Sequence, residues 1–312
     1  MASIGDYELK GGHVIAQTTG ARIDLTPTLF RDIVRAMSFV GFVRALRALR
    51  YAQGRRARAK IAFFPLHPRT YYAVWPVCHL ADVRIVKPDE DPDLFFFFED
   101  SEFRTEAALP PAERPVFNGG CIDIRKSQVT RAFEETFGYG LAVDPTTYEG
   151  AAVEKSERNG VHDGRTIECP IASPVRDKVY QKLVDNTFDG TEYVDIRTPI
   201  VGGEIPFVYL KRRRPEDRFN NENRKVDLME TDALLTAAEV EKIQAFARAM
   251  NLDFGGLDVL RDRTDGRLYI VDVNKTDMGP PTALPGRQKL RAMRMLADSF
   301  ARMVDERMGR SA

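Results

Sequence analysis

The sequence predicts an α+β protein built from two or three lobes. Its 312 residues exceed the ~100–200 residues of an ordinary single domain, so more than one core is expected. Segments with helical periodicity, such as residues 127–137 and 237–250, alternate with short apolar segments that are typical of strands. Two long strand-like segments flank the sequence VGGE at residues 201–204, which predicts an antiparallel hairpin in the second half of the chain.

The composition disfavours several classes of partner. Lysine and arginine number 46, as do aspartate and glutamate, so no overall charge attracts nucleic acid or a membrane. The aromatic-plus-basic pattern of nucleic-acid-binding sheets is also missing. Cys78, Cys121 and Cys169 are too few and too scattered for a disulfide framework or a structural zinc site. The first 20 residues lack a secretory pattern, and no run of ~18 apolar residues occurs. We therefore expect a soluble, cytoplasmic protein.

Residues 1–58 form an N-terminal segment whose main feature is an amphipathic, basic helix. Thr26 and Pro27 supply a cap and a first turn, and the helix is expected to extend towards residue 60. Its apolar residues recur at steps of three and four: Leu29, Ile33, Val34, Met37, Val40, Val43 and Leu46. This spacing favours a helix that packs on a core and exposes its arginines to water. An alternative is that the basic end, residues 44–60, binds a membrane of anionic lipid or a partner.

A small α/β lobe is predicted for residues 59–115. The segments KIAFFP and DLFFFFED are bounded by charged residues or proline and have the length of strands, and PVCHLADVRIVKP lies between them. Four consecutive phenylalanines, Phe95–Phe98, require cover on both faces of their strand, because a sheet with one wet face would alternate apolar and polar side chains. The sequence therefore predicts a parallel sheet in this lobe.

The remainder, residues 116–312, is predicted to form one larger domain with lobes at about 116–185 and 186–312. A short helix precedes the strand-like segments GLAVDP and GAAVEKS. Further strands are VYQKLVDN, the hairpin EYVDIRTPIVGGEIPFVYLKRR, GGLDVLRD and LYIVDVN. A helix is expected between the hairpin and GGLDVLRD. A last helix is expected over residues 285–308, whose apolar residues recur every three or four positions.

Two aspartates on neighbouring strands carry the main chemical signal of the sequence. Asp258 lies in GGLDVLRD and Asp272 in LYIVDVN, and the tight turn at Asp265 and Gly266 makes these strands a hairpin. Such a hairpin places both carboxylates on one face, with Asn274 two residues further on the same face. Adjacent carboxylates repel each other unless a hard divalent cation lies between them, and Mg²⁺ prefers oxygen ligands. A solvated acidic face is the alternative, but the apolar neighbours of both aspartates argue against it.

These strands belong to a longer arrangement that resembles the ATP-grasp superfamily. The arrangement runs from VYQKLVDN through DGTEYVDIRTPIVGGEI and the basic strand VYLKRR to a helix, GGLDVLRD and VDVN. Upstream, Lys126 and Lys155 fall where the family places its pair of nucleotide-binding lysines. The resemblance covers about residues 60–285. It implies an ATP-grasp fold in which two α+β lobes hold the nucleotide, preceded by a small α/β N-terminal lobe.

One set of residues implied by the resemblance would bind ATP. The lysine pair would neutralise the phosphates as point charges, a glycine in the loop that follows would let the backbone approach them, and the backbone of VYQKLVDN would contact the adenine. The residues of this set are Lys126, Lys155, Gly160, Gln181, Lys182, Leu183 and Val184.

A second implied set would bind metal and act in catalysis. Asp258, Asp272 and Asn274 would hold one or two Mg²⁺ ions that bridge the β- and γ-phosphates. Where many relatives carry a glutamate, this chain has the shorter Asp272. Positive charge near the metals would stabilise the transferred phosphoryl group. The catalytic candidates are Arg197, Lys211 and Arg213.

The resemblance implies a ligase that uses ATP and Mg²⁺. Most members activate a carboxylate as an acyl phosphate, which an amine or similar nucleophile then attacks, and this chemistry needs positioning and charge rather than a covalent side-chain nucleophile. The expected partners are a small-molecule or peptide carboxylate and a nucleophilic co-substrate, with Lys275, Thr276 and Arg287 as candidate contacts for an acidic substrate. Alternatives are a small-molecule kinase on the same fold and a non-catalytic nucleotide-binding protein whose basic helix binds a membrane or partner.

Overall fold

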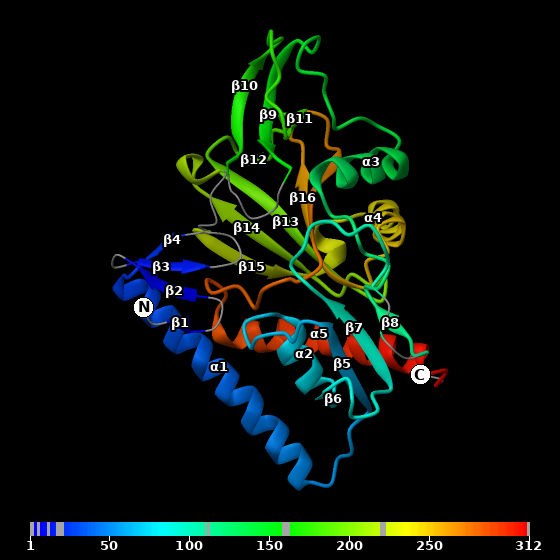
Figure 1. The fold of residues 1–312 in the computed structure, drawn as a ribbon. Helices are drawn as coiled ribbons and strands as arrows, with labels where there is room; N and C mark the ends of the chain where they lie inside the picture. The colour runs from blue at the N-terminus through cyan, green and yellow to red at the C-terminus, as the bar shows by residue number, and fades with distance from the viewer. Residues whose placement is uncertain are drawn as a thin grey trace. The chain divides into compact units, whose positions relative to one another are not determined.

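The computed structural model describes residues 3–4, 7–10, 13–16, 22–108, 110, 113–157, 163–218 and 223–310. The chain divides into two units, Met1–Arg55 and Arg56–Ala312, and each contains both β-sheet and helix (Figure 1). Among the described residues, no helix combines the length and the apolar character needed to cross a bilayer.

The first unit contains a small antiparallel sheet and a long helix. Its strands pair in the order β1-β2-β3-β4. Their bounds are β1 Ser3–Ile4, β2 Tyr7–Lys10, β3 His13–Ala16 and β4 Arg22–Asp24, and the helix is α1 Pro27–Ala52. The predicted helix is confirmed, but it ends well before residue 60 because Gly54 turns the chain with a φ of +78°.

The predicted burial of the apolar stripe is wrong for the first half of α1. Ile33, Val34 and Met37 are exposed, whereas Val43 is fully buried. Three- and four-residue spacing determines which residues share a helix face, but it does not determine whether another element covers that face. The N-terminal half of α1 therefore presents apolar side chains to solvent.

The second unit begins with a four-stranded parallel sheet in the order β6-β5-β7-β8. Its elements are β5 Ala59–Pro65, α2 Val74–Leu80, β6 Val83–Val86, β7 Leu94–Phe98 and β8 Val116–Phe117. Every residue of β7 is buried, which confirms the predicted strand with two covered faces. The C-terminal helix α5, Gly286–Arg307, packs beside α2, and its Phe300 ring lies 5.9 Å from that of Phe117 in β8 (Figure 1).

A three-stranded antiparallel sheet follows, in the order β10-β9-β11. Its strands are β9 Gly150–Ser156, β10 Arg165–Cys169 and β11 Lys178–Lys182, and α3, Lys126–Phe137, precedes them. Residues 140–145 are not the predicted strand. They form a single bridge, between Ala142 and Gln181, because the Asp144 side chain accepts from the Thr146 N–H and turns the chain.

The largest sheet is antiparallel and has the order β15-β14-β13-β16-β17, with β12 paired to β13. Its strands are β12 Thr187–Phe188, β13 Glu192–Val201, β14 Val208–Arg213, β15 Lys225–Met229, β16 Phe254–Arg261 and β17 Leu268–Asn274. The helices of this part are η1 Pro215–Asp217, η2 Thr231–Ala233 and α4 Ala237–Ala249. The predicted β13–β14 hairpin is confirmed: Gly202 and Gly203 both have positive φ, as a type I′ turn requires.

The two faces of this sheet differ in polarity. One face is apolar and packs with side chains of α3 and α4; its residues include Ile196, Ile200, Val208, Leu257, Val259 and Val273. On the other side, the register pairs Asp195 with Lys211, Arg197 with both Tyr209 and Asp258, and Asp258 with Asp272. Because side chains alternate along a strand, these six residues share one face, which is called the charged face below.

A β-bulge in β17 decides which of its side chains reach the charged face. Asp258 pairs with Asp272, but the next residue, Val259, pairs with Ile270, so Val271 is the extra residue. The bulge shifts the alternation by one position. As a result, Ile270 and Val273 both pack in the core, while Asp272 keeps the opposite face.

Candidate functional site

The aspartate pair lies where the predicted hairpin should place it. Asp258 of β16 is directly opposite Asp272 of β17, and Asn274 is opposite Gly256 on the same face. This pairing confirms the predicted placement of the three side chains, while their role as metal ligands stays a prediction.

Arg197 lies at the centre of the charged face. It is 6% exposed, with Nη1 2.9 Å from Asp258 Oδ1 and Nη2 2.6 Å from Asp277 Oδ1. When the amide oxygen of Asn274 points towards the guanidinium, it accepts from Nη1 at 2.7 Å and from Nη2 at 3.2 Å. Burial opposes the charge of Arg197, but the carboxylates of Asp258 and Asp277 outweigh burial and raise its pKa. Arg197 is therefore a permanent cation.

Gly256 makes room for this cluster. A Cβ atom at this position would lie 2.7 Å from Arg197 Nε and closer still to Asp277 Oδ2. A Cβ at the preceding Gly255 would lie 2.5 Å from the Asn274 carbonyl oxygen. The two glycines of GGLDVLRD therefore allow the ion pair and the neighbouring strand to approach β16 closely.

Lys211 reaches the same carboxylate from β14. Its Nζ lies 3.7 Å from Asp258 Oδ1. Burial lowers the pKa of Lys211, although the Asp258 carboxylate opposes this shift. For Asp258, burial favours the neutral acid, but Arg197 and Lys211 outweigh burial and hold the pKa of this carboxyl well below its usual range. Asp258 is therefore ionised at neutral pH.

Asp272 interacts with two lysines of the preceding sheet and helix. Burial raises its pKa, the positive charges of Lys126 and Lys155 lower it, and the charge of Asp258 raises it further. Lys155, on β9, donates from Nζ to the Val271 carbonyl at 3.1 Å, and burial lowers its pKa to about 8. Lys126 is the first residue of α3 and is buried, whereas Lys155 is half-buried. Two lysines and two carboxylates from different sheets and helices therefore converge.

Carboxylates hold both ends of the β9–β10 loop. Glu157 accepts from the backbone N–H and the hydroxyl of Ser127, the second residue of α3. Asp163 accepts from the backbone N–H of Ser156 at 3.0 Å. Gly160, predicted to approach phosphate from this loop, lies outside the described residues.

The backbone of the strand predicted to contact adenine is largely engaged. Gln181 pairs with β9, and the Lys182 N–H donates to the carbonyl of Leu141 at 2.8 Å. The Val184 carbonyl accepts from Arg218 at 2.9 Å. Within the described ranges no hydrogen bond involves the backbone of the residue between them, Leu183. Its N–H and C=O are therefore the groups best placed to meet a base edge.

The side chains of this strand contact neighbouring elements. Lys182 Nζ donates to Tyr269 Oη at 3.0 Å and lies 3.0 Å from Asp262 Oδ2. Burial opposes the charge of Lys182, but Tyr269 and Asp262 outweigh burial and raise its pKa. The Gln181 amide donates to Thr130 Oγ1 of α3 at 2.7 Å. These contacts tie β11 to α3 and to the β16–β17 hairpin.

Arg213 lies at one end of the charged face. It pairs with Tyr193 and is four residues along β14 from Tyr209, a separation of ~13 Å at ~3.3 Å per residue. Its guanidinium forms an ion pair with Asp195, and Asn186 Nδ2 donates to the same carboxylate at 2.9 Å. Burial raises the pKa of Asp195, and the charge of Arg213 opposes that shift. Arg213 is therefore paired with Asp195, and its charge adds to those of Arg197 and Lys211 that lower the pKa of Asp258.

Two residues of the site were not predicted. Asp277 pairs with Arg197, and its carbonyl accepts from the Ala73 N–H at 2.9 Å, which joins the segment after β17 to the parallel-sheet lobe. Tyr209 is 4% exposed, and its hydroxyl has no hydrogen-bond partner in the described part of the chain. Burial raises the pKa of Tyr209, and the charge of Asp277 acts in the same direction. The sequence did contain a signal for Tyr209: it lies two residues before Lys211, and residues two apart on a strand share a face.

Lys275 is buried away from solvent, so its predicted contact with an acidic substrate is wrong. It is 1% exposed, with Nζ 3.4 Å from the Cys121 carbonyl oxygen and 5.0 Å from the centre of the Phe97 ring. Burial lowers the pKa of Lys275. The reason lies in tertiary structure: the chain after Asn274 packs against β7 of the parallel sheet.

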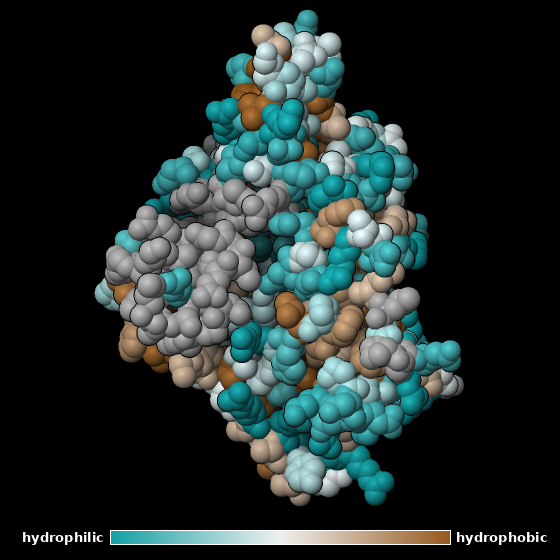
Figure 2. All heavy atoms as spheres, in the orientation of Figure 1, coloured by the Kyte–Doolittle hydropathy of each residue, from teal (hydrophilic) through white to brown (hydrophobic). Residues whose placement is uncertain are grey.

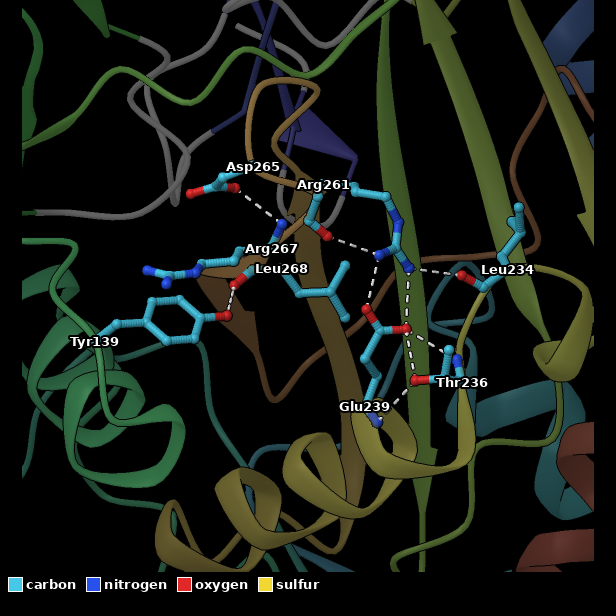
Figure 3. A network of polar contacts seen from close by, with 9 residues as sticks. Tyr139, Leu234, Thr236, Glu239, Arg261, Asp265, Arg267 and Leu268 are labelled. Carbon is cyan, nitrogen blue, oxygen red and sulfur yellow. Dashed lines mark hydrogen bonds and ion pairs between the residues drawn. The ribbon is translucent and has the colours of Figure 1, made fainter.

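An ion-pair network holds the β16–β17 hairpin against α4 (Figure 3). Arg261, the last residue of β16, donates to the two carboxylate oxygens of Glu239 at 2.7 and 3.1 Å and to the Leu234 carbonyl at 2.8 Å. Glu239 also forms the capping box of α4 with Thr236. The network therefore fixes the strand that carries Asp258.

The donor set of the charged face fits a hard divalent ion. In the described ranges no three His, Cys, Asp or Glu side chains are grouped closely enough to form a metal site by themselves. A metal here would use Asp258, Asp272 and the amide of Asn274, and would complete its coordination with water or phosphate.

Comparison with known proteins identifies the fold. No protein-family model matches the sequence, and no curated protein matches it significantly. Among solved structures 169 chains match, and the ATP-grasp ligase PsnB, complexed with minimal precursor, Mg and ADP, is similar with a TM-score of 0.50 at 12% identity. The alignment covers 80% of this chain and 100% of PsnB. The chain has an ATP-grasp fold.

Two further structures are similar at slightly lower TM-scores. D-alanine–D-alanine ligase from Bacillus anthracis, complexed with ATP, has a TM-score of 0.48 at 14% identity, covering 80% of this chain and 99% of that one. The macrocyclase MdnC from Microcystis aeruginosa MRC, bound with the precursor peptide MdnA, has a TM-score of 0.47 at 10% identity, covering 78% and 99%.

The predicted fold class, an α+β ATP-grasp fold, is confirmed. The first of its two α+β lobes consists of α3 and the β9–β11 sheet, and the second consists of α4 and the β12–β17 sheet. Lys126 and Lys155 belong to the first lobe, and Asp258 and Asp272 belong to the second. The candidate site therefore combines residues from both lobes of the ATP-grasp fold.

Proposed function

We propose that this protein is an ATP- and Mg²⁺-dependent ligase that joins a carboxylate to an amine or a similar nucleophile. The observation that carries the proposal is the convergence of Lys126 and Lys155, from one lobe, with Asp258 and Asp272 of the other. Lysines bind phosphate as point charges and paired carboxylates bind a divalent cation, so the arrangement suits a metal–nucleotide complex. The fold supports the proposal, since the similar ligase PsnB was complexed with Mg and ADP.

Asp258, Asp272 and Asn274 would hold Mg²⁺. When bound, the ion makes the γ-phosphoryl group electrophilic and offsets the charge that develops on it. Asp258 is already ionised because of Arg197 and Lys211, so it can bind a cation without losing a proton. Asp272 has a raised pKa, and a neighbouring divalent ion would favour its ionised form.

Lys126 and Lys155 would bind the phosphates of ATP. The pKa of Lys155 is about 8 in the free protein, so a nearby phosphate would favour its protonated form. The backbone of Leu183 would contact the adenine edge, within the strand segment that includes Gln181 and Val184. The loop that contains Gly160 would approach the phosphates through its backbone.

The substrate carboxylate would bind beside the cations of the charged face. One of its oxygens attacks the γ-phosphorus, the bond from that phosphorus to the departing oxygen of ADP breaks, and an acyl phosphate forms. The nucleophilic nitrogen then attacks the acyl carbon, the carbon–oxygen bond to phosphate breaks, and the nitrogen loses a proton. Lys211 and Arg197 would offset the negative charge, and the buried Tyr209 hydroxyl would donate to the substrate oxygen. Arg213 would act indirectly, by fixing Asp195 between β13 and β14.

Turnover of ATP and Mg²⁺ with pooled amino acids, small acids and peptides tests this proposal. The native protein should release ADP and phosphate when both a carboxylate and a nucleophile are present. Asp272→Asn should reduce turnover at least ~100-fold, because one metal ligand loses its charge. The matched control Asp298→Asn, at an exposed position of α5, should be as active as the native protein. Full activity of Asp272→Asn would overturn the metal assignment.

A carboxylate labelled with ¹⁸O distinguishes the ligase from a kinase on the same fold. An acyl phosphate passes one labelled oxygen to the released phosphate. A kinase leaves the phosphoryl group on its product and releases no phosphate. Recovery of a stable phosphorylated product without any nucleophile would therefore favour the kinase.

A further inference from the structure

The N-terminal unit carries a concentration of exposed apolar side chains. Of the thirteen large apolar side chains that are exposed among the described residues, eight lie between residues 25 and 51. They are Leu25, Phe30, Ile33, Val34, Met37, Phe42, Leu49 and Tyr51. Figure 2 shows apolar side chains at the surface along α1, next to hydrophilic ones. So many large apolar side chains in one short exposed segment mark an interaction surface.

Four of these side chains form one stripe on α1. At ~100° per residue, Phe30, Ile33, Val34 and Met37 fall within an arc of ~100°. Phe30 and Met37 are 70% and 69% exposed, whereas Val43, about 130° around the helix from the middle of this arc, is fully buried. The first turns of α1 therefore present an apolar stripe to solvent.

The same helix carries a concentrated positive charge. α1 contains five arginines and one aspartate, a net charge of +4, and three more arginines, Arg55, Arg56 and Arg58, follow it in the sequence. Arg44, Arg47 and Arg50 follow the apolar stripe at helical spacing. A helix that combines an apolar stripe with a basic region is typical of segments that lie on anionic membranes.

We propose that α1 binds the surface of an anionic phospholipid membrane, with its apolar stripe at the boundary of acyl chains and headgroups and its arginines near the lipid phosphates. Pairing of α1 with the α1 of a second copy fits less well, because two helices with a net charge of +4 each would repel each other. A nucleic acid would contact the arginines but would leave the apolar stripe in water. An anionic bilayer matches both features.

The expected effects follow from the two contributions to membrane binding. Each arginine near an anionic surface strengthens binding about fivefold, so the loss of three should weaken it about a hundredfold. Loss of two large apolar side chains from the stripe should weaken binding roughly tenfold or more. Added salt should weaken binding of the native protein, because it screens the charges.

Flotation of the full-length chain with phosphatidylcholine vesicles, with and without phosphatidylserine, tests the proposal. The charge variant is Arg44→Gln/Arg47→Gln/Arg50→Gln, and its matched control is Arg287→Gln/Arg291→Gln/Arg294→Gln on the exposed side of α5. The apolar variant is Phe30→Ser/Met37→Ser, and its matched control is Phe188→Ser/Met278→Ser, which changes the same residue types at other exposed positions. Circular dichroism of each variant shows whether the helices are retained.

The native protein should float only with vesicles that contain phosphatidylserine, salt should reverse this binding, and the two α1 variants should lose it while both controls keep it. Equal binding to neutral vesicles, or equal loss in the α5 control, overturns the proposal. Failure of the native chain to bind either kind of vesicle also overturns the proposal and favours an acidic protein partner. If light scattering then shows a dimer that Phe30→Ser/Met37→Ser disrupts, the partner is a second copy of the chain. If the charge variant does not fold, the salt dependence and the apolar variant decide.

Discussion

Replacing Lys155 by methionine should stabilise the fold at neutral pH. Burial lowers the pKa of Lys155 to about 8 from 10.5. At ~1.36 kcal/mol per pKa unit, the protonated side chain therefore costs the folded chain up to about 3 kcal/mol. Lys155 is half-buried, so contact with water reduces this cost, and methionine also loses the hydrogen bond to the Val271 carbonyl, worth about 1 kcal/mol. We expect a net gain of about 1 kcal/mol at pH 7.

The pH dependence of this gain has a definite sign. Because the pKa of Lys155 is lower in the folded than in the unfolded chain, the unfolded chain binds more protons between about pH 8 and pH 10.5. The cost of the lysine is fully present below pH 8 and disappears above pH 10.5, and the methionine variant lacks it throughout. The advantage of Lys155→Met should therefore shrink as the pH rises from 7 to 10.

Differential scanning calorimetry of both proteins at pH 7 and pH 10 measures the effect. A gain of about 1 kcal/mol corresponds to a Tm about 2–4 °C higher at pH 7. The matched control is Lys182→Met, which should lower the Tm at pH 7, because the pKa of Lys182 is raised and its loss leaves the buried Asp262 without this cation. A variant at position 155 that melts below the native protein at pH 7, with a shift that is the same at pH 10, would refute the reasoning.

Three further substitutions test the packing around the charged face. Gly256→Ala places a Cβ 2.7 Å from Arg197 Nε, so the Arg197–Asp277 ion pair must move, and calorimetry should show a loss of about 1–3 kcal/mol together with reduced turnover. Tyr209→Phe removes a buried hydroxyl that has no partner in the described part of the chain, so the Tm should stay equal or rise, while kcat with substrate should fall at least ~10-fold. Arg261→Met removes the guanidinium that donates to both carboxylate oxygens of Glu239 at the start of α4. The Tm should fall by about 2–4 °C, and the affinity for ATP should change little.

Each of these substitutions has a control or a contradicting outcome. Gly286→Ala is the control for Gly256→Ala, because nothing lies within 4 Å of a Cβ at this position, the start of α5. Its Tm should be unchanged or slightly higher. An equal loss of stability at both glycines would contradict the close contact at Gly256. A lower Tm for Tyr209→Phe would mean that the hydroxyl has a partner in the free protein. An unchanged Tm for Arg261→Met would contradict a stabilising role of the network in Figure 3.

The features that local pattern determines were predicted from the sequence. The β13–β14 hairpin follows from Gly202 and Gly203, because two glycines readily adopt the positive φ that a type I′ turn requires at both positions. The buried parallel strand follows from four adjacent phenylalanines. The opposition of Asp258 and Asp272 follows from the side-chain alternation in a hairpin.

Features that depend on contacts far apart in the sequence were not predicted. The spacing of Ile33 within α1 indicates a helix face but cannot show what covers it. Asp277 becomes part of the site because the parallel-sheet lobe holds its backbone, and Lys275 becomes buried for the same reason. The bulge at Val271 changes which residues face the core, and no local signal in the run of apolar residues marks it.

A crystal structure with Mg²⁺ and a non-hydrolysable ATP analogue tests the central claim most directly. The account predicts a metal ion bound by the Asp258 and Asp272 carboxylates and phosphates in contact with Lys126 and Lys155. A nucleotide bound elsewhere, or bound beside Lys126 and Lys155 with neither aspartate on its metal, would contradict the account.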